Sequence, residues 1–103
     1  MSNTETVTGG TAADTVTLAT IMTAGTVNLG TGIDALTFGD FTNSATVSNA
    51  ETITGGTGAD TITVGAALVA STINLAGGTD VLTLGNFANT ATVSNAELSL
   101  IHI

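Results

Sequence analysis

Apolar and polar residues alternate along this chain in short segments, each built around Val, Ile or Leu and flanked by Thr, Ser or Asn. An alternation of period two places the apolar residues on one face, which is typical of a half-buried β-strand. Between the segments lie Gly-Gly, Gly-Thr-Gly, Gly-Asp and Asn-Ala, which favour turns. No stretch has a convincing helical period. We therefore expect an all-β fold, and the first five strands are expected in Thr6–Thr8, Thr15–Leu18, Thr26–Leu29, Ala35–Phe38 and Ala45–Ser48.

The pattern is written twice in the chain. Residues 5–50 align without a gap with residues 51–96, and 27 of the 46 aligned positions are identical. Where the copies differ in a predicted strand, one apolar residue replaces another, as Ile53 replaces Val7, and a packed interior tolerates such exchanges. A fixed period of this length indicates units that bury their apolar faces by stacking. We predict one domain over residues 1–103, with repeats at 5–50 and 51–96 and a C-terminal strand within 97–103.

A weaker period of twenty residues lies inside each repeat. It aligns Ile53 with Ile73 and Asp60 with Asp80. Two coils then fit into one repeat, with about six extra residues in the second coil (46 − 2 × 20 = 6). Strands in neighbouring coils of such a stack lie about 4.8 Å apart. The sequence thus predicts a parallel β-solenoid, a β-helix or β-roll, of about four coils with two coils per 46-residue repeat.

Both ends of the chain lie in repeat register. Residues 2–8 match residues 48–54, and Ser94–Glu97 begins what would be a third repeat. Terminal repeats usually differ so as to cap a solenoid, but neither end carries Pro, Lys or a helical segment that would block an open strand edge. We expect copies of the chain to stack head to tail, because a heterologous contact that does not close produces a filament. The alternative is a segment excised from a longer repeat protein, in which it serves as a passive spacer.

The charge of the chain is one-sided. Eight Asp and Glu residues face no Lys or Arg, which gives a formal net charge of -8. This balance argues against nucleic acid and anionic membranes as partners, and favours a self-repelling surface or one that takes up metal cations. No apolar run is long enough for membrane insertion, and Met1–Thr8 has no features of a signal peptide. The only histidine is His102, so no hydroxyl has an evident base beside it, and we expect no enzyme activity.

One turn carries a motif with known chemistry. The pattern G-G-x-G-x-D-x-U-x is matched at every specified position by residues 55–63, in which a calcium-binding turn precedes a strand. This turn resembles the RTX family of bacterial secreted proteins, and the repeats resemble those of RTX-related adhesins and S-layer proteins. The resemblance implies a calcium-bound parallel β-roll that reaches the cell surface or the medium by a type I route, without an N-terminal signal peptide. It covers the style of the whole chain, but the full motif occurs once.

The other acidic turns depart from the motif. Residues 9–14 lack the third glycine, residues 29–34 lack the first, and residues 75–80 keep only the third. If the turns recur on a single edge, their aspartates form one ladder with neighbours about 5 Å apart. A hard divalent cation would relieve the repulsion, and oxygen ligands suit calcium. The alternative is a solvated ladder in which Asp bonds its own backbone. The candidate calcium ligands are Asp14, Asp34, Asp60 and Asp80, with Gly55, Gly56 and Gly58 of the motif.

Two further sets of polar residues recur between the repeats. Asn28 and Asn49 recur as Asn74 and Asn95, and we expect them to be ordinary turn and ladder residues that stack their amides, with a role as ligands as the alternative. Glutamates recur at positions 5, 51 and 97, where we expect a solvated face.

Together these patterns predict an extracellular structural protein, a calcium-stabilised solenoid that stacks with itself into a filament, matrix or surface layer. An ice- or surface-binding module is the alternative of a different class, because Thr-x-Thr pairs recur on the predicted strands. The alternate coils interrupt that rank, so no thermal hysteresis is expected. The pairs are Thr6/Thr8, Thr15/Thr17, Thr52/Thr54 and Thr61/Thr63, and the interruptions are Thr26/Asn28, Ala35/Thr37, Thr72/Asn74 and Val81/Thr83.

Overall fold

The computed structural model describes residues 6–66, 69–86, 90–95 and 98–102, which form eleven β-strands and contain no helix. The predicted strands are confirmed, with bounds that differ by a residue or two. The described chain has no helix that is long and apolar enough to cross a membrane. The strands are β1 (Thr6–Thr8), β2 (Thr15–Thr17), β3 (Gly25–Asn28), β4 (Ala35–Thr37), β5 (Ser44–Ser48), β6 (Thr52–Thr54), β7 (Thr61–Val64), β8 (Ser71–Asn74), β9 (Val81–Asn86), β10 (Ala91–Ser94) and β11 (Leu98–His102).

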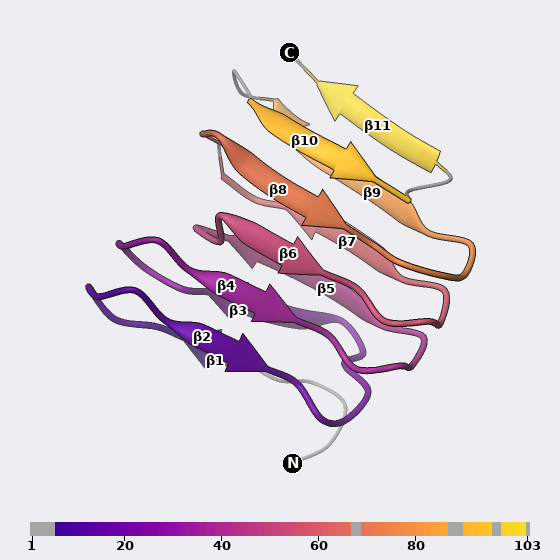
Figure 1. The fold of residues 1–103 in the computed structure, drawn as a ribbon, viewed down its shortest axis with the longest axis horizontal. Helices are drawn as coiled ribbons and strands as arrows, with labels where there is room; N and C mark the ends of the chain where they lie inside the picture. The colour runs from indigo at the N-terminus through magenta and orange to yellow at the C-terminus, as the bar shows by residue number, and fades with distance from the viewer. Residues whose placement is uncertain (1–5, 67–68, 87–89, 96–97, 103) are drawn as a thin grey trace.

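Successive strands alternate between two parallel sheets (Figure 1). The odd-numbered strands form a six-stranded sheet in the order β1-β3-β5-β7-β9-β11, and the even-numbered strands form a five-stranded sheet in the order β2-β4-β6-β8-β10. Each coil therefore contributes one strand to each sheet, and the coils stack from the N-terminus to the C-terminus. The molecule is a flat slab with extents of 31 × 30 × 17 Å. The prediction of an all-β parallel β-solenoid is confirmed.

The strand register confirms the period of twenty residues. Ile53 of β6 pairs with Ile73 of β8 in the five-stranded sheet, and Ile62 of β7 pairs with Leu82 of β9 in the six-stranded sheet. Some neighbouring strands are only seventeen residues apart, as where Ala35 pairs with Thr52. The coil is shorter there because β5 and β6 are joined by a tight turn at Asn49, which has a left-handed φ of 59°.

The number of coils in each repeat differs from the prediction. Each 46-residue repeat contains five strands, β1–β5 in the first and β6–β10 in the second, because the six extra residues form most of a strand of their own, β5. Five is an odd number, so equivalent strands lie in opposite sheets, as β1 and β6 do. Each repeat makes two and a half coils instead of two. The second repeat is consequently turned by half a turn about the solenoid axis relative to the first.

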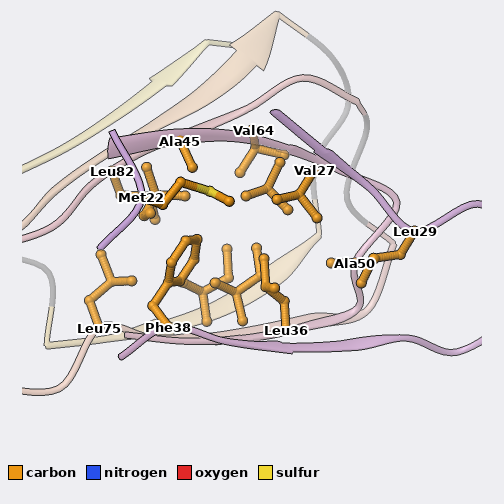
Figure 2. Packing of buried hydrophobic residues seen from close by; sticks show 14 of the residues in the cluster. Met22, Val27, Leu29, Leu36, Phe38, Ala45, Ala50, Val64, Leu75 and Leu82 are labelled. Atoms are coloured by element: carbon orange, nitrogen blue, oxygen red, sulfur yellow. The ribbon is translucent and has the colours of Figure 1, made fainter. Parts of the chain in front are cut away.

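The apolar core lies between the two sheets and receives side chains from both of them (Figure 2). Its members come from the inward positions of the strands and from the turns at both edges, and the side chains of Val27, Leu36, Ile62 and Ile73 are completely buried. Burial of such a side chain stabilises the fold by about 1.5–3 kcal/mol. Stacking of similar coils thus replaces the thick core of a globular domain.

Candidate functional site

The described acidic residues all lie in turns along the two narrow edges of the slab, and none lies in a strand. The expected single ladder of four aspartates is wrong. Asp14 and Asp34 precede β2 and β4 of the five-stranded sheet, whereas Asp60 and Asp80 precede β7 and β9 of the six-stranded sheet. The odd number of strands per repeat is the physical reason, because it moves equivalent turns to opposite edges.

On the first edge, carboxylates accept backbone hydrogen bonds from the neighbouring coil. The N–H of Asp14 donates to Oδ1 of Asp34 at 2.7 Å, and the N–H of Asp34 donates to Oε2 of Glu51 at 2.8 Å. Glu51 is half-buried in this ladder, so the expectation of a solvated face is wrong for this residue. The other two recurring glutamates, Glu5 and Glu97, lie outside the described residues.

The second edge repeats this arrangement with an asparagine. The N–H of Met22 donates to Oδ1 of Asn43 at 3.1 Å, the N–H of Asn43 donates to Oδ1 of Asp60 at 3.2 Å, and the N–H of Asp60 donates to Oδ1 of Asp80 at 2.8 Å. We call this chain of bonds the Asn43 ladder. In both ladders a side chain that lies just before a strand accepts a hydrogen bond from a backbone N–H group in a turn of the preceding coil. These bonds satisfy turn N–H groups that would otherwise need another partner.

Asn43 takes part in this ladder through both its backbone N–H and its side-chain amide, and it was not identified from the sequence. Its Nδ2 donates to Oδ1 of Asp60 at 2.9 Å and to the carbonyl oxygens of Gly39 and Phe41, both at 3.1 Å. The side chain is 1% exposed. The available signal was the recurrence of Asn43 as Asn89 in the second repeat.

The second carboxylate oxygen closes the turn to which the aspartate belongs. Oδ2 of Asp14 accepts the N–H of Gly10 at 2.9 Å, and Oδ2 of Asp60 accepts the N–H of Gly56 at 3.3 Å. These bonds match the alternative in which Asp acts as a turn former.

Asp34 differs from these two aspartates. In its turn the N–H of Gly30 donates to Oδ1 of Asn28 at 3.1 Å, so this donor is not offered to Asp34. Oδ2 of Asp34 is buried and has no hydrogen-bond partner among the described residues. A buried polar atom left in this way costs about 1–3 kcal/mol, and more when it is charged.

Burial raises the pKa of Asp60 above its ordinary value of 3.8. Hydrogen bonds from Asn43 and Gly56 act in the opposite direction, and the negative charge of Asp80 adds a smaller upward contribution. The environment of Asp60 therefore favours the neutral carboxyl, although the ladder supplies donors to the ionised form.

The glycines of the motif turn allow the coils to approach closely. A Cβ at Gly56 would collide with the backbone of Gly39 in the preceding coil, and a Cβ at Gly58 would collide with the carbonyl of Phe41. At the equivalent of Gly58 the first repeat has Ala12, and the described chain has no coil before that position. The packing of coils thus explains the glycine at position 58.

The described residues contain no group of three or more His, Cys, Asp or Glu side chains placed to hold a metal ion. The oxygens of Asp14 and Asp60 already accept backbone N–H groups, and Gly55, Gly56 and Gly58 pack against neighbouring atoms. Nor do the described residues enclose a pocket. A cation held by these described turns would have to combine fewer than three such side chains with other oxygen atoms.

The two broad faces are free of charge along β1–β10. On the six-stranded sheet the register forms a column of threonines that is unbroken from β1 to β9 and continues with Leu100 in β11, whereas one neighbouring column changes from Thr8 to Asn28 and Ser48. On the five-stranded sheet one column is interrupted once, by Ala35. Its threonines are Thr15, Thr52, Thr72 and Thr92. The unbroken column consists of Thr6, Thr26, Thr46, Thr63 and Thr83.

Asparagine side chains pair between coils at the turns. Nδ2 of Asn49 donates to Oδ1 of Asn28 at 2.7 Å, and Nδ2 of Asn95 donates to Oδ1 of Asn74 at 2.7 Å. Asn49 and Asn95 also adopt left-handed φ values, which asparagine tolerates better than most residues. The expected turn and ladder roles occur together in these residues.

No protein-family model matches the chain, and no curated protein or solved structure matches it either.

Proposed function

We propose that this protein is an extracellular structural module, a β-solenoid that stacks end to end with copies of itself into a filament or surface layer. The observation that carries the proposal is the state of the core in the first and last coils. Val7 and Val16 are only half-buried, while their repeat equivalents Ile53 and Ile62 are 1% and 0% exposed. At the other end Val93 is half-buried and its equivalent Val47 is 1% exposed.

The open ends are complementary in their backbone groups as well. All strand pairs among the described residues are parallel, and β1 and β11 are the two end strands of the six-stranded sheet. Their free edges are therefore the two opposite edges of one parallel sheet. A β1 edge can therefore continue the hydrogen-bond ladder of a sheet that ends in another copy. Exposed edges of this type pair readily with other chains, and repetition of a contact that does not close gives a filament.

The extracellular location rests on the resemblance of the motif turn to RTX proteins. The flat shape, the uncharged faces and the carboxylates committed to the backbone support a structural role over a catalytic one.

Negative-stain electron microscopy of the purified chain tests the proposal. We expect thin unbranched fibres whose formation depends on protein concentration. The variant Val93→Glu places a charge at the open end of the core and should abolish the fibres, whereas Thr92→Glu adds the same charge on the outward side of the same strand and should retain them. Discrete particles of single-chain mass in the wild type would reject stacking and favour a passive spacer within a longer adhesin.

Calcium stabilisation is a separate proposal, supported by the motif resemblance and by eight acidic residues without a Lys or Arg. Within the described residues its structural support is Oδ2 of Asp34, which is buried without a hydrogen-bond partner. We expect calcium chloride to raise the melting temperature above that in sodium chloride of equal ionic strength, and Asp34→Asn to remove the difference. Equal melting temperatures for the wild type in the two salts would reject calcium binding.

A second candidate function is binding to an ordered, periodic surface such as ice. The observation that favours it is the unbroken column from Thr6 to Thr83, in which hydroxyl and methyl groups repeat at the strand spacing of about 4.8 Å. The interruptions expected from the alternate coils lie in the two columns that flank this one, at Asn28 on one side and at Val81 on the other.

Thermal hysteresis and the shape of ice crystals test this second candidate. Thr46→Lys places a charge in the middle of the column and should abolish any hysteresis. Thr72→Lys, on the outward side of the opposite sheet, is the matched control and should leave it unchanged. Zero hysteresis in the wild type would reject the candidate.

A further inference from the structure

The two sheets differ by one strand, and this difference restricts how a second copy can continue both of them. Among the described strands, the six-stranded sheet ends at β1 and β11, and the five-stranded sheet ends at β2 and β10. Strands alternate between the sheets along the chain, so the position that would follow β11 lies in the five-stranded sheet, next to β10.

We propose that a second copy docks after a half-turn about the solenoid axis, with its β1 beside β10 and its β2 beside β11. The inference rests on the end-to-end stacking proposed above and names its geometry. The half-turn lets strands alternate across the junction as they do within the chain, and neither sheet loses a strand.

Stacking without rotation leaves a gap in one sheet. The β1 of the second copy would then lie beside β11, its β2 would lie one level further along, and the strand position between that β2 and β10 would be empty. Backbone groups on both sides of the gap would lose their strand partners, and the core would be open to water at that level.

The chain already contains the half-turn relation. β6 is the repeat equivalent of β1, and it lies in the five-stranded sheet between β4 and β8. A strand of the β1 sequence type is therefore accommodated in that sheet, with its central apolar residue, Ile53, 1% exposed.

The register within the chain identifies which residues would meet at the junction. Thr52 of β6 belongs to a column that continues through Thr72 to Thr92. Thr6 is the equivalent of Thr52, so after a half-turn Thr6 of the second copy would lie beside Thr92. Without rotation, Thr6 would extend its own column, which continues from Thr83 to Leu100.

Disulfide cross-linking distinguishes the two arrangements, because the chain has no cysteine. Neighbouring strands lie about 4.8 Å apart, within the range of Cα separations that a disulfide spans. The double variant Thr6→Cys/Thr92→Cys should give a ladder of covalent multimers on a non-reducing gel after mild oxidation of the fibres. The double variant Thr6→Cys/Leu100→Cys should remain a monomer on the gel, and Thr6→Cys alone should give no species larger than a dimer.

The outcomes separate the half-turn from stacking itself. A ladder from Thr6→Cys/Leu100→Cys in place of Thr6→Cys/Thr92→Cys overturns the half-turn and leaves end-to-end stacking intact. Fibres without cross-links in either double variant also overturn the half-turn. Single-chain particles for the wild type and both double variants overturn stacking and the half-turn together.

Discussion

Replacement of Asn43 by alanine tests whether the buried ladder holds the coils together. The substitution removes the acceptor for the Met22 N–H and the donor to Asp60, both of which are buried. A stranded buried N–H costs about 1–3 kcal/mol, and a lost hydrogen bond to a charged group about 1.5–3 kcal/mol. The carbonyls of Gly39 and Phe41 lose a donor as well, but they lie where water can replace it in part.

We therefore expect Asn43→Ala to lower the free energy of unfolding by about 3–5 kcal/mol, out of a total of about 5–15 kcal/mol for a domain of this size. The measurement is urea unfolding followed by far-UV circular dichroism, since the chain has no Trp or Tyr for fluorescence. It is made at a protein concentration too low for stacking. An unchanged dependence on urea would show that the variant exposes the same surface on unfolding.

The matched control is Asn28→Ala. Asn28 is exposed, and its Oδ1 also accepts two hydrogen bonds, from Gly30 and Asn49. Water can replace these bonds, so we expect a loss below about 1 kcal/mol. If the two variants lose stability to within about 1 kcal/mol of each other, the reasoning that burial of the ladder determines its contribution is refuted.

Three further predictions follow from the same geometry. The pKa of Asp60 in the folded chain is raised above 3.8, so its contribution to stability is present at acidic pH and decreases as the pH rises through the folded pKa. Asp60→Asn should flatten that part of the profile of stability against pH. An unchanged profile would contradict this expectation. Gly58→Ala should lower the melting temperature because of the collision with the preceding coil, while Ala12→Gly should change stability by less than about 1 kcal/mol. Ile53→Ala should cost about 2–5 kcal/mol in urea unfolding, and Val7→Ala clearly less in the unstacked chain; equal losses would mean that the terminal coil is as closed as the middle one.

The sequence by itself determined the strands, the core and the solenoid. Alternation of period two marks each strand because it depends only on residues near in sequence, and apolar exchanges between the two copies, such as Val7 to Ile53, identify the inward positions. The twenty-residue period likewise gave the register in which Ile53 pairs with Ile73. The motif glycines were recognised as a set, although the structure uses Gly56 and Gly58 for close approach between coils.

Only the tertiary structure decided which residues share an edge. The segment Ser44–Ser48 counts as a full strand, so each repeat has five strands, and Asp14 and Asp60 move to opposite edges. The five strands predicted for residues 5–50 already had this odd number, but its consequence for the edges was missed because two whole coils were assigned to each repeat. The ladder role of Asn43 depended in the same way on contacts between coils, since its partner Asp60 lies seventeen residues away. Local sequence specifies each strand and turn, but the stacking of coils specifies which polar groups meet, because those groups belong to different turns of the chain.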